Sequence, residues 1–148
     1  MHEYTVPRAA IALTAAVAKT IVAITTPATR RARLKEFSIG FKSTVSTDEA
    51  ALVELIRFDT DGTGTAITPE PVVADYPAAL CGAKHTYTVE PTGNVTVKKV
   101  WRVPVQGGEL VYQIPVGDEV EVPISKGLGL RVTCAQAQSA DVYLKFDE

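Results

Sequence analysis

The C-terminal segment, residues 127–148, alternates between apolar and polar side chains, and this pattern limits the possible folds of the chain more than any other feature. Its first half carries Leu128, Leu130, Val132 and Cys134 on one parity, against Gly129, Arg131 and Thr133 on the other. After the polar stretch 136–139 the alternation resumes, with Val142, Leu144 and Phe146 against Tyr143, Lys145 and Asp147. Successive side chains of a strand point to opposite faces, so the pattern predicts a hairpin with one apolar and one solvated face. We expect its two strands to complete a sheet formed by the preceding residues.

The rest of the chain repeats this kind of pattern in short segments. The segments that are β-branched or alternating are 19–26, 34–43, 51–58, 86–89, 95–105, 109–116 and 120–124. Turn signals separate them at intervals of roughly 8–12 residues, as in sandwiches and barrels. Gln106-Gly107-Gly108 predicts the tight turn of a hairpin, and residues 59–82 are predicted as a long irregular loop. The sequence therefore predicts an all-β domain over residues 18–148, a jelly-roll-like β-sandwich of about eight strands.

Residues 1–17 are predicted to form an extended N-terminal arm, which can contribute a strand. Tyr4 and Val6 lie in its extended first part, 1–7. Residues 9–18 fit a helix by their alanine content, or a strand because Ile11, Leu13 and Val17 share a parity. Lys19 and Thr20 end the apolar run well short of the ~20 residues that a membrane span needs. We therefore expect no membrane contact, and synthesis without a secretion pathway.

Charge and cysteine content exclude some classes of protein. A formal net charge of −2 and a pI near 5.7 argue against a nucleic-acid-binding protein, which is normally strongly basic. Two cysteines are too few for a disulfide framework. Cys134 lies on the apolar parity of its strand, which favours a buried reduced thiol. A bridge between Cys81 and Cys134 stays open, because separation in sequence says nothing about distance in space.

Catalytic and metal-binding patterns are absent from the sequence. His2 and His85 have no cysteine or carboxylate at ligand spacing. Segment 59–64, Asp-Thr-Asp-Gly-Thr-Gly, lacks the third acidic ligand and the final glutamate of a calcium loop, so we interpret it as a turn. There is no Gly-x-Ser-x-Gly motif and no glycine-rich loop leading into a helix. The sequence predicts a protein that is not an enzyme and needs no cofactor or metal.

Segment 51–58 is apolar on both parities, unlike the other predicted strands. Val53 and Leu55 lie on one side, and Leu52, Ile56 and Phe58 on the other. Such a strand is either central in a sheet covered on both faces or lies at a contact between subunits. We take it as the candidate subunit contact.

Two basic clusters are candidates for binding an acidic protein surface or a neighbouring subunit. Their members are Arg30, Arg31, Arg33 and Lys35 in the first, and Lys98, Lys99 and Arg102 around Trp101 in the second. Arg and Trp are enriched in the hot spots of interfaces. The alternative is a solvated strand edge that resists aggregation through its charge.

Several short stretches in order resemble a group of small proteins encoded in the structural gene clusters of tailed phages and prophages. The stretches are Ala18-Lys-Thr20, Pro27-Ala-Thr-Arg-Arg31, Glu36-Phe-Ser-Ile-Gly40, Asp61-Gly-Thr-Gly-Thr65, Thr88-Val-Glu-Pro-Thr92, Trp101, Gln106-Gly-Gly108 and Gly127-Leu-Gly-Leu-Arg-Val-Thr133. The group is similar to capsid decoration (cement) proteins, which have a jelly-roll body and commonly assemble as trimers on the outer head. No catalytic residues come with this resemblance.

The resemblance implies a non-enzymatic structural protein of the virion that decorates and stabilises the outside of a phage capsid. Its expected partners are two further copies of itself, in a homotrimer, and the major capsid protein of a tailed phage. Its expected location is the capsid surface, after synthesis in the bacterial host cytoplasm. The expected contact residues are Tyr4, Val6, Arg30, Arg31, Leu52, Ile56, Phe58, Trp101 and Arg102, and the arm and the 59–82 loop are expected to reach the capsid.

Two alternatives remain. One is a phage tail, fibre or host-recognition module that binds carbohydrate. Aromatic residues are few, and Trp101 shares its parity with core-like valines, which lowers this alternative. The other is an unrelated soluble binding domain or enzyme.

Overall fold

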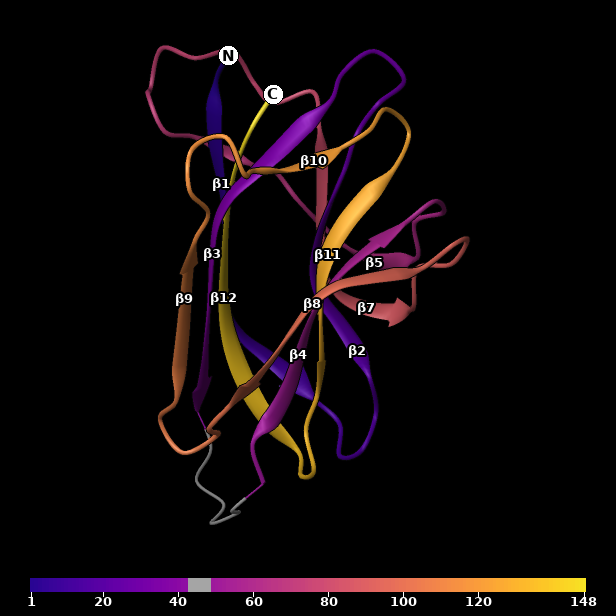
Figure 1. Cartoon of the computed structure of the whole chain (residues 1–148), viewed down its shortest axis with the longest axis vertical. Coiled ribbons are helices and arrows are strands. Elements are labelled where there is room, and N and C mark those ends of the chain that lie inside the picture. Colours follow the sequence, from indigo (N-terminus) through magenta and orange to yellow (C-terminus); the bar gives the residue numbers. More distant parts are fainter. Residues whose placement is uncertain (43–48) are drawn as a thin grey trace.

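Two antiparallel sheets packed face to face make up the structure, a computed structural model that describes residues 1–42 and 49–148. Sheet I contains, in spatial order, β10 (Val120–Val122), β3 (Ala32–Lys42), β12 (Gln138–Asp147), β1 (Glu3–Leu13) and β6 (Glu70–Pro71), and β9 (Glu109–Gln113) also pairs with β3. Sheet II runs β5 (Thr63–Ile67), β7 (Gly82–Val89), β2 (Lys19–Thr25), β11 (Gly127–Thr133), β4 (Ala51–Phe58) and β8 (Thr96–Val103). Figure 1 shows the two layers side by side. The predicted all-β sandwich is confirmed, with twelve strands in the described residues.

The two strands of the predicted C-terminal hairpin lie in different sheets. β11 pairs with β2 and β4 in sheet II, whereas β12 pairs with β1 and β3 in sheet I. The turn between them therefore crosses from one layer to the other, and the hairpin prediction is wrong. Each strand fills a central position, so the C-terminal segment completes both sheets at once.

The turn at 106–108 also joins strands of different sheets. Gly107 has a φ of +63°, as a tight turn requires. However, β8 pairs with β4 and β9 pairs with β3, so the predicted hairpin between these strands is wrong as well.

The N-terminal segment is an integral strand of the sandwich and not a separate arm. β1 lies between β12 and β6, and the register with β12 is interrupted between Arg8 and Ile11. Ala10, at this interruption, has a φ of 56°, and its N–H donates to Asp141 Oδ1 over 2.8 Å. Residues 9–13 are therefore strand and not helix. The two termini pair with each other through His2 and Glu148, at the same end of the molecule (Figure 1).

The predicted 59–82 loop contains two further strands, β5 and β6. The Thr-Gly-Thr-Ala-Ile sequence of β5 lacks apolar alternation, which is why it was not predicted. Gly64 allows β5 to approach β7 closely, because a Cβ there would lie 2.9 Å from the His85 carbonyl oxygen and 3.2 Å from Tyr87 Cδ2. Only the part of the segment after β6 is irregular over a long distance.

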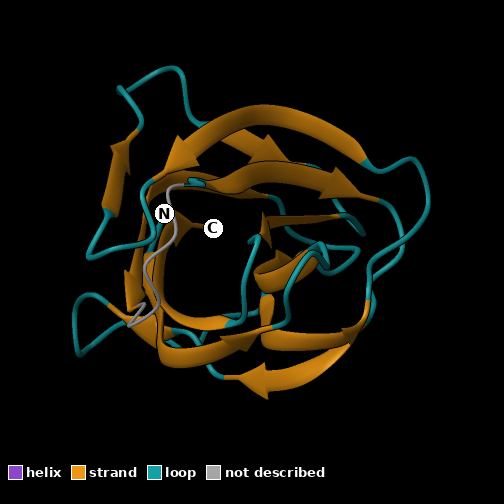
Figure 2. Cartoon of the chain, turned by 90° about the horizontal axis from the view of Figure 1, so that it is seen from below, coloured by secondary structure: helices purple, strands orange, loops and turns teal. Residues whose placement is uncertain are grey.

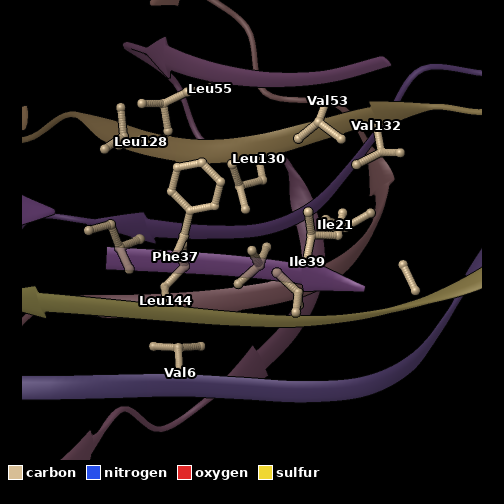
Figure 3. Close-up of a cluster of buried hydrophobic side chains, with 14 of the residues drawn as sticks. Val6, Ile21, Phe37, Ile39, Val53, Leu55, Leu128, Leu130, Val132 and Leu144 are labelled. Atoms are coloured by element: carbon tan, nitrogen blue, oxygen red, sulfur yellow. The ribbon is translucent and has the colours of Figure 1, made fainter. Parts of the chain in front are cut away.

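The core is the set of inward side chains from both sheets. Leu128, Leu130 and Val132 of β11 face Phe37 and Leu144 of sheet I, and Figure 3 shows these residues interdigitating between the layers. All are at most 1% exposed. Viewed along the long axis, the two layers curve around this interior (Figure 2).

Candidate interaction surface

The second apolar face of β4 is covered by the chain itself. Ile56 and Phe58 pack with Ala23 and Tyr87 in a small cluster on the outer side of sheet II, separate from the main core. Phe58 is fully buried, and its ring lies where a side chain on Gly127 would stand, 2.1 Å from an added Cβ. Of the two interpretations of this strand, the covered sheet is right. Ile56 and Phe58 are not available as a subunit contact.

Two other predicted contact residues also lie inside the molecule. Tyr4 and Val6 are 0% exposed and belong to the main core. The Tyr4 hydroxyl donates to the Pro77 carbonyl over 3.0 Å, which ties β1 to the loop after β6. Side chains buried in this way are not available at the surface for a partner, so the prediction for these two residues is wrong.

The Asp-rich turn is held by donors from the chain. Asp59 Oδ1 pairs with Lys126 Nζ at 2.9 Å, and its Oδ2 accepts from Asn94 at 2.7 Å. Asp61 Oδ1 accepts from the Tyr87 hydroxyl at 2.8 Å, and Lys84 Nζ lies 2.6 Å from its Oδ2. These bonds fold the turn over the Phe58 cluster. Within residues 1–42 and 49–148, no group of three or more His, Cys, Asp or Glu side chains is arranged to hold a metal ion.

Three members of the first basic cluster form ion pairs, and among the described residues one arginine forms none. Arg31 pairs with Glu121, and Arg33 lies 3.2 Å from Asp147. Lys35 Nζ lies 2.9 Å from Glu3 and 3.4 Å from Asp147, and its pairing with Glu3 raises the pKa of the Lys35 ammonium. Most of this cluster therefore stabilises the outer face of sheet I through ion pairs.

Arg30, the fourth member of this cluster, is exposed. It lines a hollow of about 240 Å³ beside the paired termini, together with Met1, His2, Tyr4, Pro77, Ala78, Leu80 and Glu148. Both carboxylate oxygens of Glu148 accept backbone N–H groups, from Leu80 and Cys81 at 2.8 Å each. Among the described residues, Arg30 forms no ion pair.

Trp101 supports β8 from the inner side. Its ring lies 5.1 Å from Phe37 in an edge-on arrangement and 5.2 Å from Tyr112, centroid to centroid. The Lys99 ammonium sits over the Tyr112 ring, 4.6 Å from its centroid. This aromatic cluster joins the edge of sheet II to β3 and β9 of sheet I. Trp101 is therefore a packing residue, and its indole is only partly exposed.

The outer side of β8 carries several exposed apolar residues close together. We define the β8 surface as Val95, Val97, Lys98, Val100 and Arg102, with Leu52 of the neighbouring β4. Val97 is 42% and Val100 60% exposed, and Val95, just before the strand, is 38% exposed. Arg102 pairs in register with Leu52, so two of the predicted contact residues do come together here. They also line a hollow of about 500 Å³.

Alternation in the sequence puts Val100 on the parity of Lys98 and Arg102 but puts Val97 on that of Trp101, and the register shift opposite Leu55 and Ile56 brings both valines to the same face. Val100 lies opposite Glu54, and Val97 opposite Ile56, so both valines face outward. A strand at the edge of a sheet that places cations and valines toward solvent is a candidate for contact with another protein.

Comparison with known proteins identifies no relative. No family model, no curated protein and no solved structure matches this chain. In the described residues no helix is long and apolar enough to cross a membrane.

Both cysteines are free and buried, so the chain has no bridge between Cys81 and Cys134. Burial raises the pKa of both thiols, and for Cys81 the adjacent Glu148 carboxylate adds to the effect. Because the thiolate is the reactive form, we expect neither thiol to react with Ellman's reagent in the native protein. In denaturant both should react, without prior reduction. Rapid reaction of one thiol in native buffer, or fewer than two thiols after unfolding, would contradict this.

Proposed function

We propose that this chain is a non-enzymatic structural protein of a virion, with a jelly-roll-like body, that decorates the outside of a tailed-phage capsid as a homotrimer. The observation that supports a binding role is the β8 surface, where exposed valines lie beside Lys98 and Arg102 on one sheet edge. Neither cation forms an ion pair with another described residue. The resemblance of the stretches between Ala18 and Thr133 to capsid decoration proteins supplies the class of partner.

The rigidity of the sandwich suits this role. The sheets are joined by a continuous core, and the outer face of sheet I is braced by ion pairs of Glu3 with Lys35 and Lys145, each at 2.9 Å. A rigid body presents several contact surfaces in a fixed geometry. Attachment of a trimer at several points then converts modest single contacts into strong overall binding.

The carbohydrate-binding alternative has less support. Sugar sites usually present an open aromatic face to the ligand, but Trp101 packs against Phe37 and Tyr112. The partly exposed rings of Tyr112 and Tyr76 are also in contact with other rings. The described aromatic side chains therefore do not form a platform that resembles a sugar site.

The test of this proposal is sedimentation of the purified protein with phage particles separated into heads and tails. We expect it to bind heads lacking decoration, to saturate at a fixed ratio to the major capsid protein, and to raise the temperature at which the heads rupture. Heads already fully occupied serve as the control and should bind little. Binding to isolated tails instead of heads would contradict the decoration role and support a tail or fibre module.

A further inference from the structure

Among the edge strands in the described part of the chain, β8 is the longest. It spans eight residues and pairs only with β4, whereas the edge strands β5, β6, β9 and β10 have five, two, five and three. A register shift opposite Leu55 and Ile56 leaves Lys98 without a partner on β4, so the regular part of the edge is Lys99 to Val103. Natural sheets usually protect such an edge by charge or by a bulge. Here the protection is incomplete, because Val97 and Val100 stay exposed beside the cations.

The charges on this edge disfavour pairing of β8 with the same strand of a second copy. Lys98, Lys99 and Arg102 lie within five residues, and β8 contains no acidic residue. An antiparallel β8–β8 pair would bring these cations together, which is destabilising. Any partner of this edge should instead carry carboxylates among apolar residues.

Segment 70–75 of the same chain has this chemistry. It reads Glu-Pro-Val-Val-Ala-Asp, with Val72 46% and Val73 44% exposed. Glu70 and Asp75 are exposed, and neither forms an ion pair among the described residues. The segment begins at β6, the last strand of sheet I. The Val72 N–H donates to the backbone carbonyl oxygen of Glu3 over 2.9 Å, which fixes the start of the loop in place.

The two complementary surfaces lie on opposite sides of the sandwich. Trp101 of β8 contacts Phe37 of β3, so β8 stands over the β3 side of sheet I. β1 and β6 lie toward the other side, where β1 contacts β7. Two different surfaces on opposite sides produce head-to-tail contacts, which close into a ring when the rotation between copies permits it.

We propose that the β8 surface of one copy receives segment 70–75 of the next copy, and that this head-to-tail contact builds the trimer. Glu70 and Asp75 face Lys98 and Arg102 across the contact, and Val72 and Val73 cover Val97 and Val100. The proposal rests on the self-association part of the proposed function and is independent of the capsid. It predicts that each copy uses both surfaces. When all copies carry the same substitution in one of these surfaces, every contact of the ring therefore contains that substitution.

The test is a charge reversal with rescue inside one chain. Lys98→Glu with Arg102→Glu, and separately Glu70→Lys with Asp75→Lys, should each weaken association about tenfold or more, because like charges then face each other. The variant with all four changes should regain association. Arg8→Glu with Lys42→Glu is the matched control, since both residues are exposed on sheet I and the charge change equals that of the first pair. Light scattering over a concentration series measures the mass, and thermal unfolding checks that each variant is folded.

The wild-type protein is expected at three times its chain mass of 15.8 kDa, and the two single-surface variants as monomers. A monomeric wild type at every concentration would overturn the proposal, as would a trimer unaffected by either reversal or a fourfold variant that stays monomeric. The head-sedimentation experiment is separate. A trimer whose variants behave as predicted but which does not bind phage heads would contradict the decoration role and still support the subunit contact.

Discussion

Replacement of Phe58 by alanine is expected to lower the free energy of unfolding by about 3–5 kcal/mol, the usual cost of removing a fully buried aromatic side chain. Phe58 has 0% of its surface exposed and packs with Ile56, Tyr87 and Ala23 on the outer side of sheet II. Its ring also occupies the space over Gly127, so its loss leaves a cavity between β4 and β11. For a domain of this size, such a loss is a large share of the total stability.

The same substitution distinguishes an internal cluster from a subunit contact. If Phe58 stabilises the fold of each copy, urea unfolding of Phe58→Ala shifts to lower concentration whether or not the protein is associated. Leu52→Ala, on the same side of β4 but only half-buried, is the matched control and should cost about 1 kcal/mol or less. A Phe58→Ala protein that keeps its unfolding midpoint but dissociates would show that Phe58 faces another subunit.

Side-chain alternation was sufficient to predict most strands but not their partners. The bounds of β4 were predicted as they stand, and β2, β3, β8 and β11 were placed to within a few residues. Alternation records which side of a strand is buried. A strand of either sheet in a sandwich has one inward face, so β11 and β12 show the same pattern although they belong to different layers. The hairpin interpretations failed for this reason.

The residues that bury the outer face of β4 could not be predicted from the sequence either. The apolar residues on both sides of β4 correctly indicated two buried faces, but not what buries the second one. That cover comes from Tyr87 and from the Asp-rich turn, through the bonds of Asp61 to Tyr87 and Lys84. Polar turn residues have no periodicity, so their packing over a distant strand becomes visible only in three dimensions.

Most of the predicted contact residues stabilise the fold of the chain itself, by packing in its interior or by forming ion pairs within it. Tyr4, Val6, Ile56 and Phe58 are core residues, and Arg31 is paired with Glu121. Leu52 and Arg102 do meet at the outer side of sheet II, next to Val97 and Val100. Exposed valines on an edge strand give no signal in the sequence, because valine is common in buried strands as well. Segment 70–75 was predicted only as part of a long irregular loop.

Breaking the ion pair between Arg131 and Glu54 should cause the second largest loss of stability, because the pair lies largely buried on the outer face of sheet II. Arg131 Nη2 is 2.5 Å from Glu54 Oε2, and their side chains are 25% and 11% exposed. Thr20 and Val100 flank the pair in register, so the carboxylate has little access to water. Replacing Arg131 by methionine leaves that carboxylate buried without its partner. We expect the free energy of unfolding to fall by about 3 kcal/mol, at the lower end for a broken buried pair because the arginine is partly solvated.

Removing both charges should be much less harmful than removing one. In the double variant Glu54→Leu with Arg131→Met, no charge is left to desolvate, and two apolar side chains can pack against Val100. Such replacements of a buried pair are often neutral or stabilising, so we expect the double variant to regain most of the stability lost by Arg131→Met. Urea unfolding of the two single variants and the double variant gives the coupling energy directly. If the two single losses simply add, the pair makes no joint contribution, and the stability of this face comes from packing alone. A large coupling would mean that this specific charge pair stabilises the outer face of sheet II, directly beside Val100 of the β8 surface.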